Sequence, residues 1–454
     1  MMKYTLNNYR DKKFGKKYLI TTDHGSWVFL KKNEYNQLES GKFSKNLFDK
    51  LEKAGIILTE KNTYQVINDY KERNFFLFYG PSLHIVVPTL RCNMNCIYCH
   101  ASSVPENKKG YDMDKKTAKK VVDFIFKSPN KSITIEFQGG EPLLNWNIVK
   151  YITNYSLNKN KTEKKELRLA LVTNLVEMDE NKLDFLIKKG VSICTSLDGP
   201  KIVHDYNRRY LNGSNYEKVV KWIKKINKKY KQIGKDINMG ALVTLTKKSL
   251  KYPKEIVDEY VKLGLHSIHL RFLNGLGVAK KSWKKISYSV DDYLAFWKKA
   301  VSYIENLKNK GVKIQERMIK IMEQKISEKF DPNYIDLKSP CGAAIGQLVY
   351  NYDGKIYSCD EARMLKEDIF MLGDVKKDSY KKILTSSKTC SIINASINEN
   401  FVCNDCVYKP YCGVCPVCNY AEQGNVIADI IRTARCKIFM NQFDWVFKEK
   451  FINK

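Results

Sequence analysis

The sequence predicts an α/β protein whose central part is a partial, open (β/α)6 barrel. Short apolar runs such as LHIVVP, SITIEF and LRLALVT alternate with helical patterns, and six such alternations occur between residues 83 and 272. Apolar strands flanked by helices favour a parallel sheet that is covered on its outer face. Six units are fewer than a complete eight-unit barrel needs, so we expect the sheet to remain open.

The N-terminal stretch predicts a smaller unit of its own. The expected elements are two strands within residues 16–31, helices from Asn33 and from Ser44, and strand-like pieces at Ile56–Leu58 and Tyr64–Ile67. This pattern predicts a winged-helix-like domain over residues 1–78. The alternative is a simple appendage that packs on the main domain.

Three further segments complete the expected organisation, because the chain is too long for one compact core. The barrel is assigned to residues 79–285. Helical patterns at Val290–Lys308 and Arg317–Lys329 predict a helical bridge over residues 286–338. Residues 339–454 form a cysteine-rich third domain.

The composition of the chain limits the cellular compartment and the classes of binding partner that we expect. The chain has neither an apolar run long enough for a membrane span nor an N-terminal secretory signal, so we expect a cytoplasmic protein with no membrane partner. Thirteen cysteines in that reducing compartment suggest metal or redox use rather than disulfides. The net charge of +30 comes mostly from dispersed lysine. It reflects either a lysine-rich composition or an acidic partner such as a peptide leader, and no nucleic acid is expected.

One short loop carries the strongest chemical signal. Cys92, Cys96 and Cys99 follow the first barrel strand with C-x3-C-x2-C spacing. Three thiolates from one loop can bind three irons of a cubane [4Fe–4S] cluster and leave the fourth iron open to a small molecule. Three chance cysteines or a zinc loop are the alternative, but zinc prefers paired knuckles that supply four ligands.

This loop, with Tyr98 before its last cysteine, resembles the signature of the radical S-adenosylmethionine (SAM) superfamily. The resemblance implies that the open iron binds SAM and that one electron cleaves SAM to a 5′-deoxyadenosyl radical. Gly139-Gly140-Glu141-Pro142 looks like the family's GGEP motif, which meets the SAM amino group. Further positions that resemble SAM-binding residues are Asn174, Ser196, Asp198 and Arg208. A helix cap is the alternative for Ser196 and Asp198, and Arg271 either faces substrate or balances an acid.

A second group of cysteines lies in the C-terminal third and resembles the SPASM domain, which holds two auxiliary [4Fe–4S] clusters. The resemblance assigns one cluster to Cys403, Cys406, Cys412 and Cys436, and the other to Cys341, Cys359 and Cys415. Cys418 is a candidate for the missing fourth ligand, and otherwise one iron stays open. A zinc ribbon is the alternative interpretation for this whole group of C-terminal cysteines. Cys194 and Cys390 are expected to be structural thiols.

Asp360 follows Cys359 directly. In sulfatase-maturing SPASM enzymes an Asp at the matching place acts as a base beside the cluster, so Asp360 is the candidate catalytic residue. An acid at this place can also simply cap a turn.

Longer strings, among them HLRFLNGLGVAK and YKPYCGVCPVCNY, resemble the radical SAM maturases of His-Xaa-Ser peptide systems. The resemblance implies an enzyme with three [4Fe–4S] clusters and SAM that installs a side-chain crosslink, C–C or C–heteroatom, in a ribosomally made precursor peptide. It also implies a leader bound by the winged-helix-like (RRE-like) domain and a reducing protein such as flavodoxin or ferredoxin. The rival functions are a formylglycine-forming anaerobic sulfatase maturase and, from another class, a non-catalytic multi-cluster electron-transfer protein.

Overall fold

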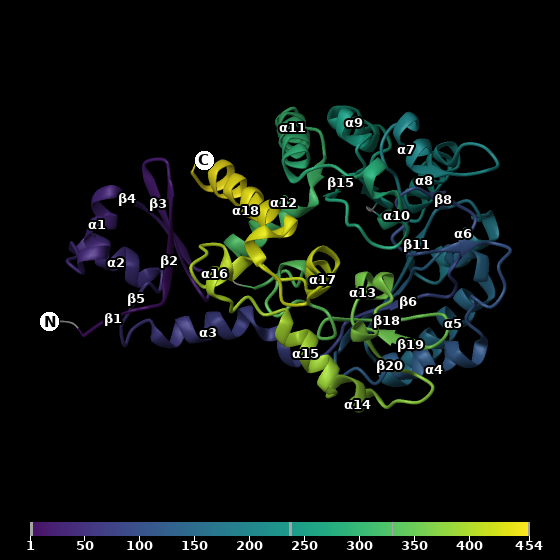
Figure 1. Ribbon diagram of the computed structural model, residues 1–454, viewed down its shortest axis with the longest axis horizontal. Coiled ribbons are helices and arrows are strands. Elements are labelled where there is room, and N and C mark those ends of the chain that lie inside the picture. Colours follow the sequence, from purple (N-terminus) through teal and green to yellow (C-terminus); the bar gives the residue numbers. More distant parts are fainter. Residues whose placement is uncertain (1–2, 236–237, 329, 453–454) are drawn as a thin grey trace.

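The computed structural model describes residues 3–235, 238–328 and 330–452, and it confirms an α/β fold with an open, barrel-like sheet. The N-terminal unit, the cysteine-rich C-terminal third and the barrel lie in a row (Figure 1). The C-terminal third therefore lies between two segments that precede it in the chain. No helix in the described ranges is long and apolar enough to cross a membrane.

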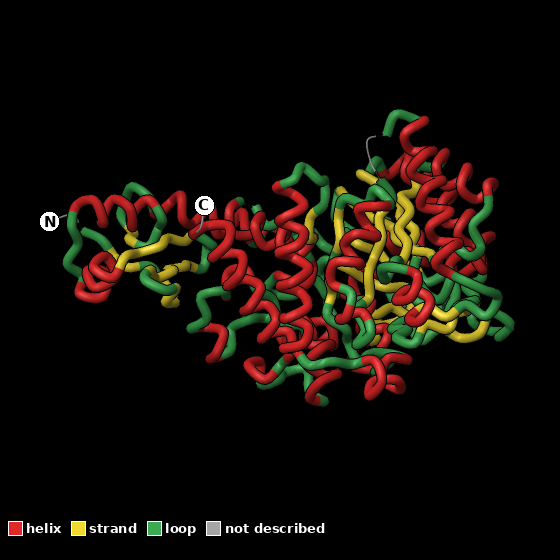
Figure 2. Tube along the Cα trace, turned by 90° about the horizontal axis from the view of Figure 1, so that it is seen from above, coloured by secondary structure: helices red, strands yellow, loops and turns green. Residues whose placement is uncertain are grey.

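The barrel strands lie side by side in chain order. They are β6 (Leu83–Val86), β10 (Ser132–Phe137), β11 (Glu166–Thr173), β12 (Val191–Ser196), β14 (Gly240–Thr244) and β16 (Leu270–Arg271). Every neighbouring pair is parallel, as predicted. The helices between them are α4 (Lys115–Ile125), α5 (Trp146–Glu163), α6 (Glu180–Lys188), α7 (Lys201–Asn207), α8 (Asn215–Gln232) and α9 (Pro253–Lys262). Figure 2 shows the strands gathered in one part of the molecule with helices around them.

Strand β10 shows how the sheet divides its two faces. Ile133, Ile135 and Phe137 are fully buried in the main core, whereas Thr134 and Glu136 between them are only partly buried. Because alternate side chains point to opposite faces, one face meets the helices and the other faces the barrel interior. On β10, the side chains that face the barrel interior are therefore the polar ones.

The cysteine-rich third extends the barrel sheet rather than forming a separate one. Strand β18 (Gln347–Tyr350) pairs in parallel with β6, and β19 (Lys355–Tyr357) and β20 (Met371–Asp374) continue outward in antiparallel pairing, which makes nine strands in all. The remaining helices of this third are α13 (Asp360–Leu365), α14 (Tyr380–Leu384), α15 (Ser387–Ala395), α16 (Phe401–Asn404), α17 (Pro416–Gln423) and α18 (Ala434–Val446). One sheet thus spans the expected boundary at residue 339.

The connection from the barrel to this third is helical, as predicted. Helix α10 (Val278–Ile286) is followed by α11 (Val290–Asn309) and α12 (Arg317–Ser327), which contact α18. A two-residue strand, β17 (Gln315–Glu316), pairs in parallel with β15 (Ser267–Ile268) and holds the bridge against the barrel edge.

The N-terminal unit has its own core but differs from the predicted wing. Its elements are β1 (Thr5–Leu6), β2 (Tyr9–Phe14), β3 (Lys17–Thr22), β4 (Trp27–Lys31), α1 (Lys32–Ser40), α2 (Lys45–Lys53), β5 (Ile57–Leu58) and α3 (Thr63–Arg73). The two strands within residues 16–31 and both helices are confirmed. Two strands were not predicted: β1, which pairs with β5, and β2, which pairs with β3.

The strand predicted at Tyr64–Ile67 is wrong, because these residues lie in α3. Asn62 causes the difference. Its side chain accepts from the amide of Thr59 at 2.8 Å and donates to the carbonyls of Glu52 and Ile57 at 2.7 Å each, which turns the chain into a helix. Such local side-chain bonds compete with strand formation, and a four-residue apolar pattern does not outweigh them.

The unit packs on the cysteine-rich third rather than on the barrel. Thr21 Oγ1 donates to the carbonyl of Val407 at 2.8 Å, and the Tyr411 hydroxyl donates to the carbonyl of Gly25 at 3.0 Å. Trp27 packs edge-on against Phe447 beyond α18. The N-terminal unit thus contacts the segment that carries Cys406 and Cys412.

The shared sheet yields a stability prediction. The buried His84 on β6 shares a hydrogen bond of 3.0 Å with the buried hydroxyl of Tyr350 on β18. Tyr350→Phe leaves the Nδ1 atom of His84 without its partner, and we expect a loss of about 1–3 kcal/mol in the free energy of unfolding, measured by urea denaturation. Tyr352→Phe is the control because its half-buried ring has no hydroxyl hydrogen bond to another described residue; about 0.5 kcal/mol or less is expected. Equal losses in the two variants would contradict this account.

Candidate active site

Two short ladders hold the loop that carries Cys92, Cys96 and Cys99. Strand β7 (Arg91–Cys92) pairs with β9 (Val104–Pro105), and β8 (Asn95–Cys96) pairs antiparallel with β13 (Arg208–Arg209). The amide of Cys99 donates to the carbonyl of Cys96 at 3.1 Å. All three thiols consequently line a single cleft of about 220 Å³ at the carboxyl ends of the barrel strands.

Gly139 and Gly140 follow β10 and lie against the backbone before this loop. A Cβ atom on Gly140 would lie 2.2 Å from the carbonyl oxygen of Arg91, and one on Gly139 would lie 2.5 Å from that of Thr89. The amide of Gly140 donates to Thr89, and that of Glu141 donates to Arg91. Both positions therefore need glycine because the two backbones touch.

The Glu141 side chain joins two strand ends. Its carboxylate is fully buried and accepts from Thr173 Oγ1 at 2.7 Å, from the amide of Asn174 at 2.8 Å and from the amide of Leu143 at 3.0 Å. Burial raises the pKa of Glu141 to about 7. Asn174 in turn donates to Asn93 at 2.9 Å and lies 3.8 Å from the sulfur of Cys92. Glu141 thus orients Asn174 beside the first cysteine, and its contact with SAM stays a prediction.

A buried charge chain supports the opposite side of the cleft. Arg208 donates to the Tyr98 hydroxyl at 2.7 Å, and that hydroxyl donates to Asp198 at 2.7 Å. Asp198 also accepts from Asn207 and from the amide of Thr244. Asp198 therefore does not cap α7, whose N-cap is Pro200 without a side-chain bond.

Arg208 keeps capacity for a ligand. Its Nε atom is buried and has no hydrogen-bond partner in the described ranges, and Arg208 lines the same cleft as the three thiols. A buried guanidinium with an unused donor suits a carboxylate. Together with three thiols on one loop, this donor set fits an iron–sulfur cluster and the carboxylate of SAM.

The structure sorts the residues predicted to bind SAM into two layers. Those that line the cleft with the cysteines are Gly139, Gly140, Asn174, Ser196 and Arg208. Glu141 and Asp198 lie behind this lining and hold it in place. Arg271 lines the cleft and pairs with Glu361 at 3.4 Å, so its pairing with an acid is observed and its contact with substrate stays a prediction.

Sequence reasoning missed other residues of the cleft. Gln138, His100 and Met364 line it as well. The position of His100, directly after Cys99, and of Gln138, directly before the glycines, was a usable signal. Nothing in the sequence indicated Met364, because it reaches the cleft from α13 in the cysteine-rich third.

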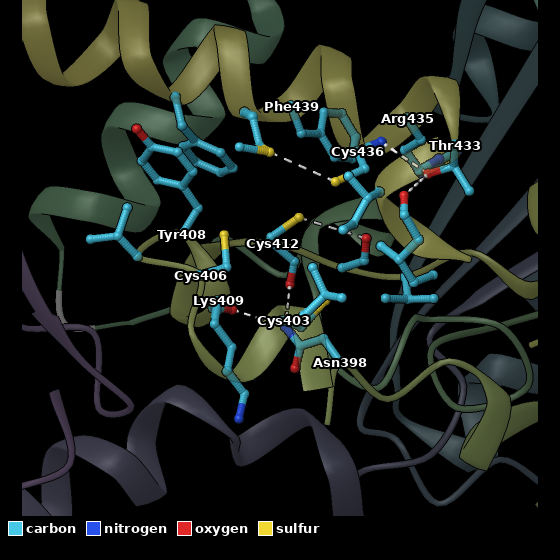
Figure 3. Close-up of a pocket in the computed structure, with 18 of the residues that line it drawn as sticks. Asn398, Cys403, Cys406, Tyr408, Lys409, Cys412, Thr433, Arg435, Cys436 and Phe439 are labelled. Carbon is cyan, nitrogen blue, oxygen red and sulfur yellow. Dashed lines mark hydrogen bonds between the residues drawn. The ribbon is translucent and has the colours of Figure 1, made fainter. Parts of the chain in front are cut away.

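Eight C-terminal cysteines lie in two groups. Cys403, Cys406, Cys412 and Cys436 surround a cavity of about 340 Å³ (Figure 3). Burial and the other three thiols of this group raise the pKa of Cys412. Cys403 follows a helix start capped by Asn400, and Cys436 follows one capped by Thr433, so backbone amides fix both positions.

Cys341, Cys359, Cys415 and Cys418 form the other, more deeply buried group. Burial, Glu361 and Cys341 raise the pKa of Cys359, and contact with Cys418 followed by burial raises that of Cys415. The amide of Cys418 donates to the sulfur of Cys415 at 3.4 Å. Arg435 donates to the sulfur of Cys418 at 3.5 Å. Contact with Cys415, followed by Arg435, lowers the pKa of Cys418 to about 7.

No three His, Cys, Asp or Glu side chains in the described ranges are close enough to share one metal ion. A cubane cluster distributes its thiolates over separate irons. Cys194 on β12 and the exposed Cys390 on α15 lie outside all three groups.

Asp360 begins α13 and points toward the barrel. Its carboxylate accepts from Arg363 at 2.9 and 3.2 Å, and Arg363 also donates to the carbonyl of Ala101 at 3.3 Å, two residues beyond Cys99. Helix α13 therefore connects Cys359, at its start, with the loop that carries the first three cysteines.

Comparisons with known proteins agree with this architecture. Residues 86–259 match the family model of the radical SAM superfamily, and residues 341–407 match that of SPASM, an iron–sulfur cluster-binding domain. A cysteine-type anaerobic sulfatase-maturating enzyme of Clostridium perfringens is 24% identical over 378 residues, which cover 81% of this chain and 96% of that enzyme.

Two solved structures share the fold. The structure of anSMEcpe with bound AdoMet superposes with a TM-score of 0.68 at 20% identity, and the match covers 82% of this chain and 98% of that chain. SuiB of Streptococcus suis, solved with its precursor peptide SuiA, superposes with a TM-score of 0.56 at 15% identity. That match covers 94% of this chain and 98% of SuiB.

The glycine contact yields a prediction about the cleft. Gly140→Ala places a methyl group against the Arg91 carbonyl, so the cysteine loop must shift by a fraction of an ångström or more. Misplacement of that size costs about 10²-fold in rate, and we expect such a loss in SAM cleavage. Gly240→Ala is the matched control, because its Cβ would lie 3.4 Å from the nearest atom, the sulfur of Cys194. A Gly140→Ala enzyme that keeps the wild-type rate would refute the packing argument.

Proposed function

We propose that this chain, which carries a radical SAM domain and a SPASM domain, is an enzyme that crosslinks side chains in a ribosomally made precursor peptide. One observation carries the proposal. Met364 of α13 lines the cleft of the three loop thiols, and the N-cap of α13 is Cys359, which belongs to a second thiol group. A peptide side chain in this cleft would lie between two redox sites, as an oxidative bond-forming reaction requires.

In this proposal, Cys92, Cys96 and Cys99 hold the cluster that binds SAM. When bound, cluster and SAM supply a 5′-deoxyadenosyl radical that removes a hydrogen atom from the substrate. Arg208 binds the SAM carboxylate, and the Gly139–Gly140 backbone, Asn174 and Ser196 hold the rest of the molecule. Glu141 and Asp198 act by fixing these groups.

The C-terminal cysteines hold two auxiliary [4Fe–4S] clusters in this proposal, which brings the total to three. Cys403, Cys406, Cys412 and Cys436 bind one of them. Cys341, Cys359 and Cys415 bind the other, with Cys418 as the fourth ligand. The proximity of Cys418 to Cys415 and the adjacent Arg435 support this choice, because a neighbouring cation favours the thiolate that iron requires.

Asp360 accepts the proton that leaves when the substrate radical is oxidised. It lies directly beside Cys359, and Arg363 holds its carboxylate toward the loop at Ala101. Overall, one substrate hydrogen would leave as an atom and the second as a proton to Asp360, and the cluster that Cys341, Cys359, Cys415 and Cys418 would hold would accept the remaining electron. The two substrate atoms then bond to each other.

A leader peptide is the proposed ligand of the N-terminal unit. The unit has its own core and packs beside the cysteine-rich third. The fold match to anSMEcpe leaves about a fifth of this chain uncovered although it uses 98% of that chain, whereas the match to SuiB, a protein solved with a precursor peptide, covers 94%. This difference favours a peptide maturase, and we place the chain near the His-Xaa-Ser maturases on the strings quoted above.

A formylglycine-forming sulfatase maturase is the second candidate. The 24% identity to the Clostridium perfringens enzyme over 96% of its length supports it. The two functions differ in product. A crosslink removes two hydrogens and ties two residues together, whereas formylglycine formation converts one side chain to an aldehyde.

The first test concerns the cluster loop. Anaerobically reconstituted enzyme with SAM and dithionite is expected to form 5′-deoxyadenosine, measured by mass spectrometry, and the Cys92, Cys96 and Cys99→Ala triple variant is expected to form none. The same assay is repeated with small peptides encoded beside the gene and with a sulfatase peptide. Absence of 5′-deoxyadenosine in every arm, from protein with a full complement of iron, would refute the radical SAM activity.

The second test concerns Asp360. Asp360→Asn keeps the shape of the side chain but removes the proton acceptor, so we expect 5′-deoxyadenosine to form while modified peptide falls by about 10²–10⁴-fold. Asp368→Asn, in the same domain outside the cleft, is the control. Wild-type product yield from Asp360→Asn would exclude the proposed role of Asp360 as a base.

A further inference from the structure

We propose that the outer surface of the Cys92–Cys99 loop is the docking site of an acidic one-electron carrier protein. This inference rests on the proposed function, because it concerns the electron with which that reaction begins. The surface, called here the basic collar, consists of Lys280, Lys281, Lys284 and Lys285 on α10 together with Arg209 on β13.

Helix α10 is the layer that covers the cysteine loop. The amide of Val278, its first residue, donates to the carbonyl of Cys99 at 2.8 Å. A Cβ atom on Gly277 would lie 2.3 Å from the carbonyl oxygen of His100, so the chain entering α10 touches the loop backbone. Ala279 and Ile286 bury one face of α10 in a small core with Tyr98. The collar lysines are thus one helix thickness, about 10 Å, from the loop.

The collar cations are unpaired. All five side chains are exposed, and none forms an ion pair with another described residue. Arg209 joins the same surface because β13 pairs with β8, where Arg209 lies opposite Asn95, between Cys92 and Cys96.

The stretches that form this surface contain no acidic residue, although Glu106, Asp205, Glu217, Glu259 and Asp291 directly flank them. Residues 88–105, 206–216 and 260–290, which form the loop, the β13 turn and α10 with its flanks, contain no Asp or Glu. Some lysines elsewhere are paired with acids, although Lys221, Lys224, Lys228 and Lys231 on α8 are exposed and form no ion pair within the described residues. On α8, Lys225 pairs with Glu180 and Lys229 with Asp184 of the neighbouring α6. The lack of Asp and Glu within these three stretches gives the collar a local excess of positive charge next to the cysteine loop.

An exposed apolar side chain follows Arg209 closely in the chain. Leu211, two residues after Arg209, is 89% exposed at the tip of a turn closed by the bridge between Tyr210 and Gly213. An exposed large apolar side chain within a polar surface is typical of a protein interface. A surface that combines cations with an exposed apolar side chain suits a protein partner better than a nucleic acid. Four lysines and one arginine also provide few guanidinium groups for bidentate binding to phosphates or bases.

The transfer itself is simple to balance. The reduced carrier loses one electron, the cluster proposed for Cys92, Cys96 and Cys99 gains that electron, and no bond forms or breaks. Complementary charge raises the rate of encounter 10- to 10³-fold at low salt and loses this effect as salt increases. The basic collar therefore sets the rate of cluster reduction by a protein donor and leaves reduction by a small reagent unaffected.

The test compares two electron sources on reconstituted holoenzyme. Reduced flavodoxin, an acidic carrier, and dithionite are each supplied in turn, and formation of 5′-deoxyadenosine and bleaching of the cluster are followed. The variant K280E/K281E/K284E/K285E is compared with K221E/K224E/K228E/K231E, which changes four exposed lysines on α8 by the same charge. A milder variant with the four α10 lysines changed to Gln, and L211D, complete the set.

We expect the α10 charge reversal to lower the flavodoxin-driven rate at least about tenfold and to abolish its salt dependence. The α8 variant, and every dithionite-driven rate, are expected to stay within twofold of wild type. If the fourfold charge reversal also slows the dithionite-driven reaction, the Gln variant and L211D provide the test. In these two variants, the proposal requires the flavodoxin-driven rate to fall relative to the dithionite-driven rate.

Three results would overturn the proposal. The first is a flavodoxin-driven rate in wild type that does not fall with salt. The second is an equal loss in the α8 variant, which would assign the effect to net charge. The third is tight binding of an RNA duplex at physiological salt that depends on the α10 lysines while flavodoxin-driven rates do not. A wild-type enzyme inactive with dithionite would refute the proposed function instead.

Discussion

The contact between the Gly139–Gly140 backbone and the carbonyls of Thr89 and Arg91 is the constraint on which the rest of the cleft depends. This backbone contact fixes the distance between the cysteine loop and the ends of the barrel strands, and no side chain intervenes. Once the loop is fixed there, Glu141 has a single place for its carboxylate, and this place determines the orientation of Asn174. The cofactor side of the cleft is built from backbone contacts first and from side chains second.

The second organising feature is the continuity of one sheet through two domains. Because β18 pairs with β6, the cysteine-rich third is fixed against the first barrel strand. Helix α13 begins shortly after β19 ends, which places it at the open end of the barrel. Rigid placement of this kind is what a two-site oxidation needs, since reacting groups must be held within a fraction of an ångström. A flexible linker between the domains would not provide it.

The alternation of apolar runs and helical patterns was enough to predict the barrel order, because each parallel strand needs its own crossover helix. Cysteine spacing indicated the loop that gathers three thiols in one cleft, and the glycine pair indicated a strand end. Residues that act across long sequence distances could not be predicted. Met364 reaches the cleft from another domain, and the Arg208–Tyr98–Asp198 chain depends on a β13–β8 pairing of two residues each. The error at Tyr64–Ile67 has the opposite cause, because the hydrogen bonds of one asparagine outweighed a short apolar pattern.

The hydrogen bond from Thr21 to Val407 has a consequence for how the molecule matures. Val407 lies between Cys406 and Cys412, so the surface on which the N-terminal unit rests is the same segment that the proposed cluster would order. Binding that stabilises this segment therefore also stabilises the packing of the N-terminal unit on it, because the two equilibria are thermodynamically linked. In this proposal, loss of the cluster would also weaken the packing of the N-terminal unit on this segment.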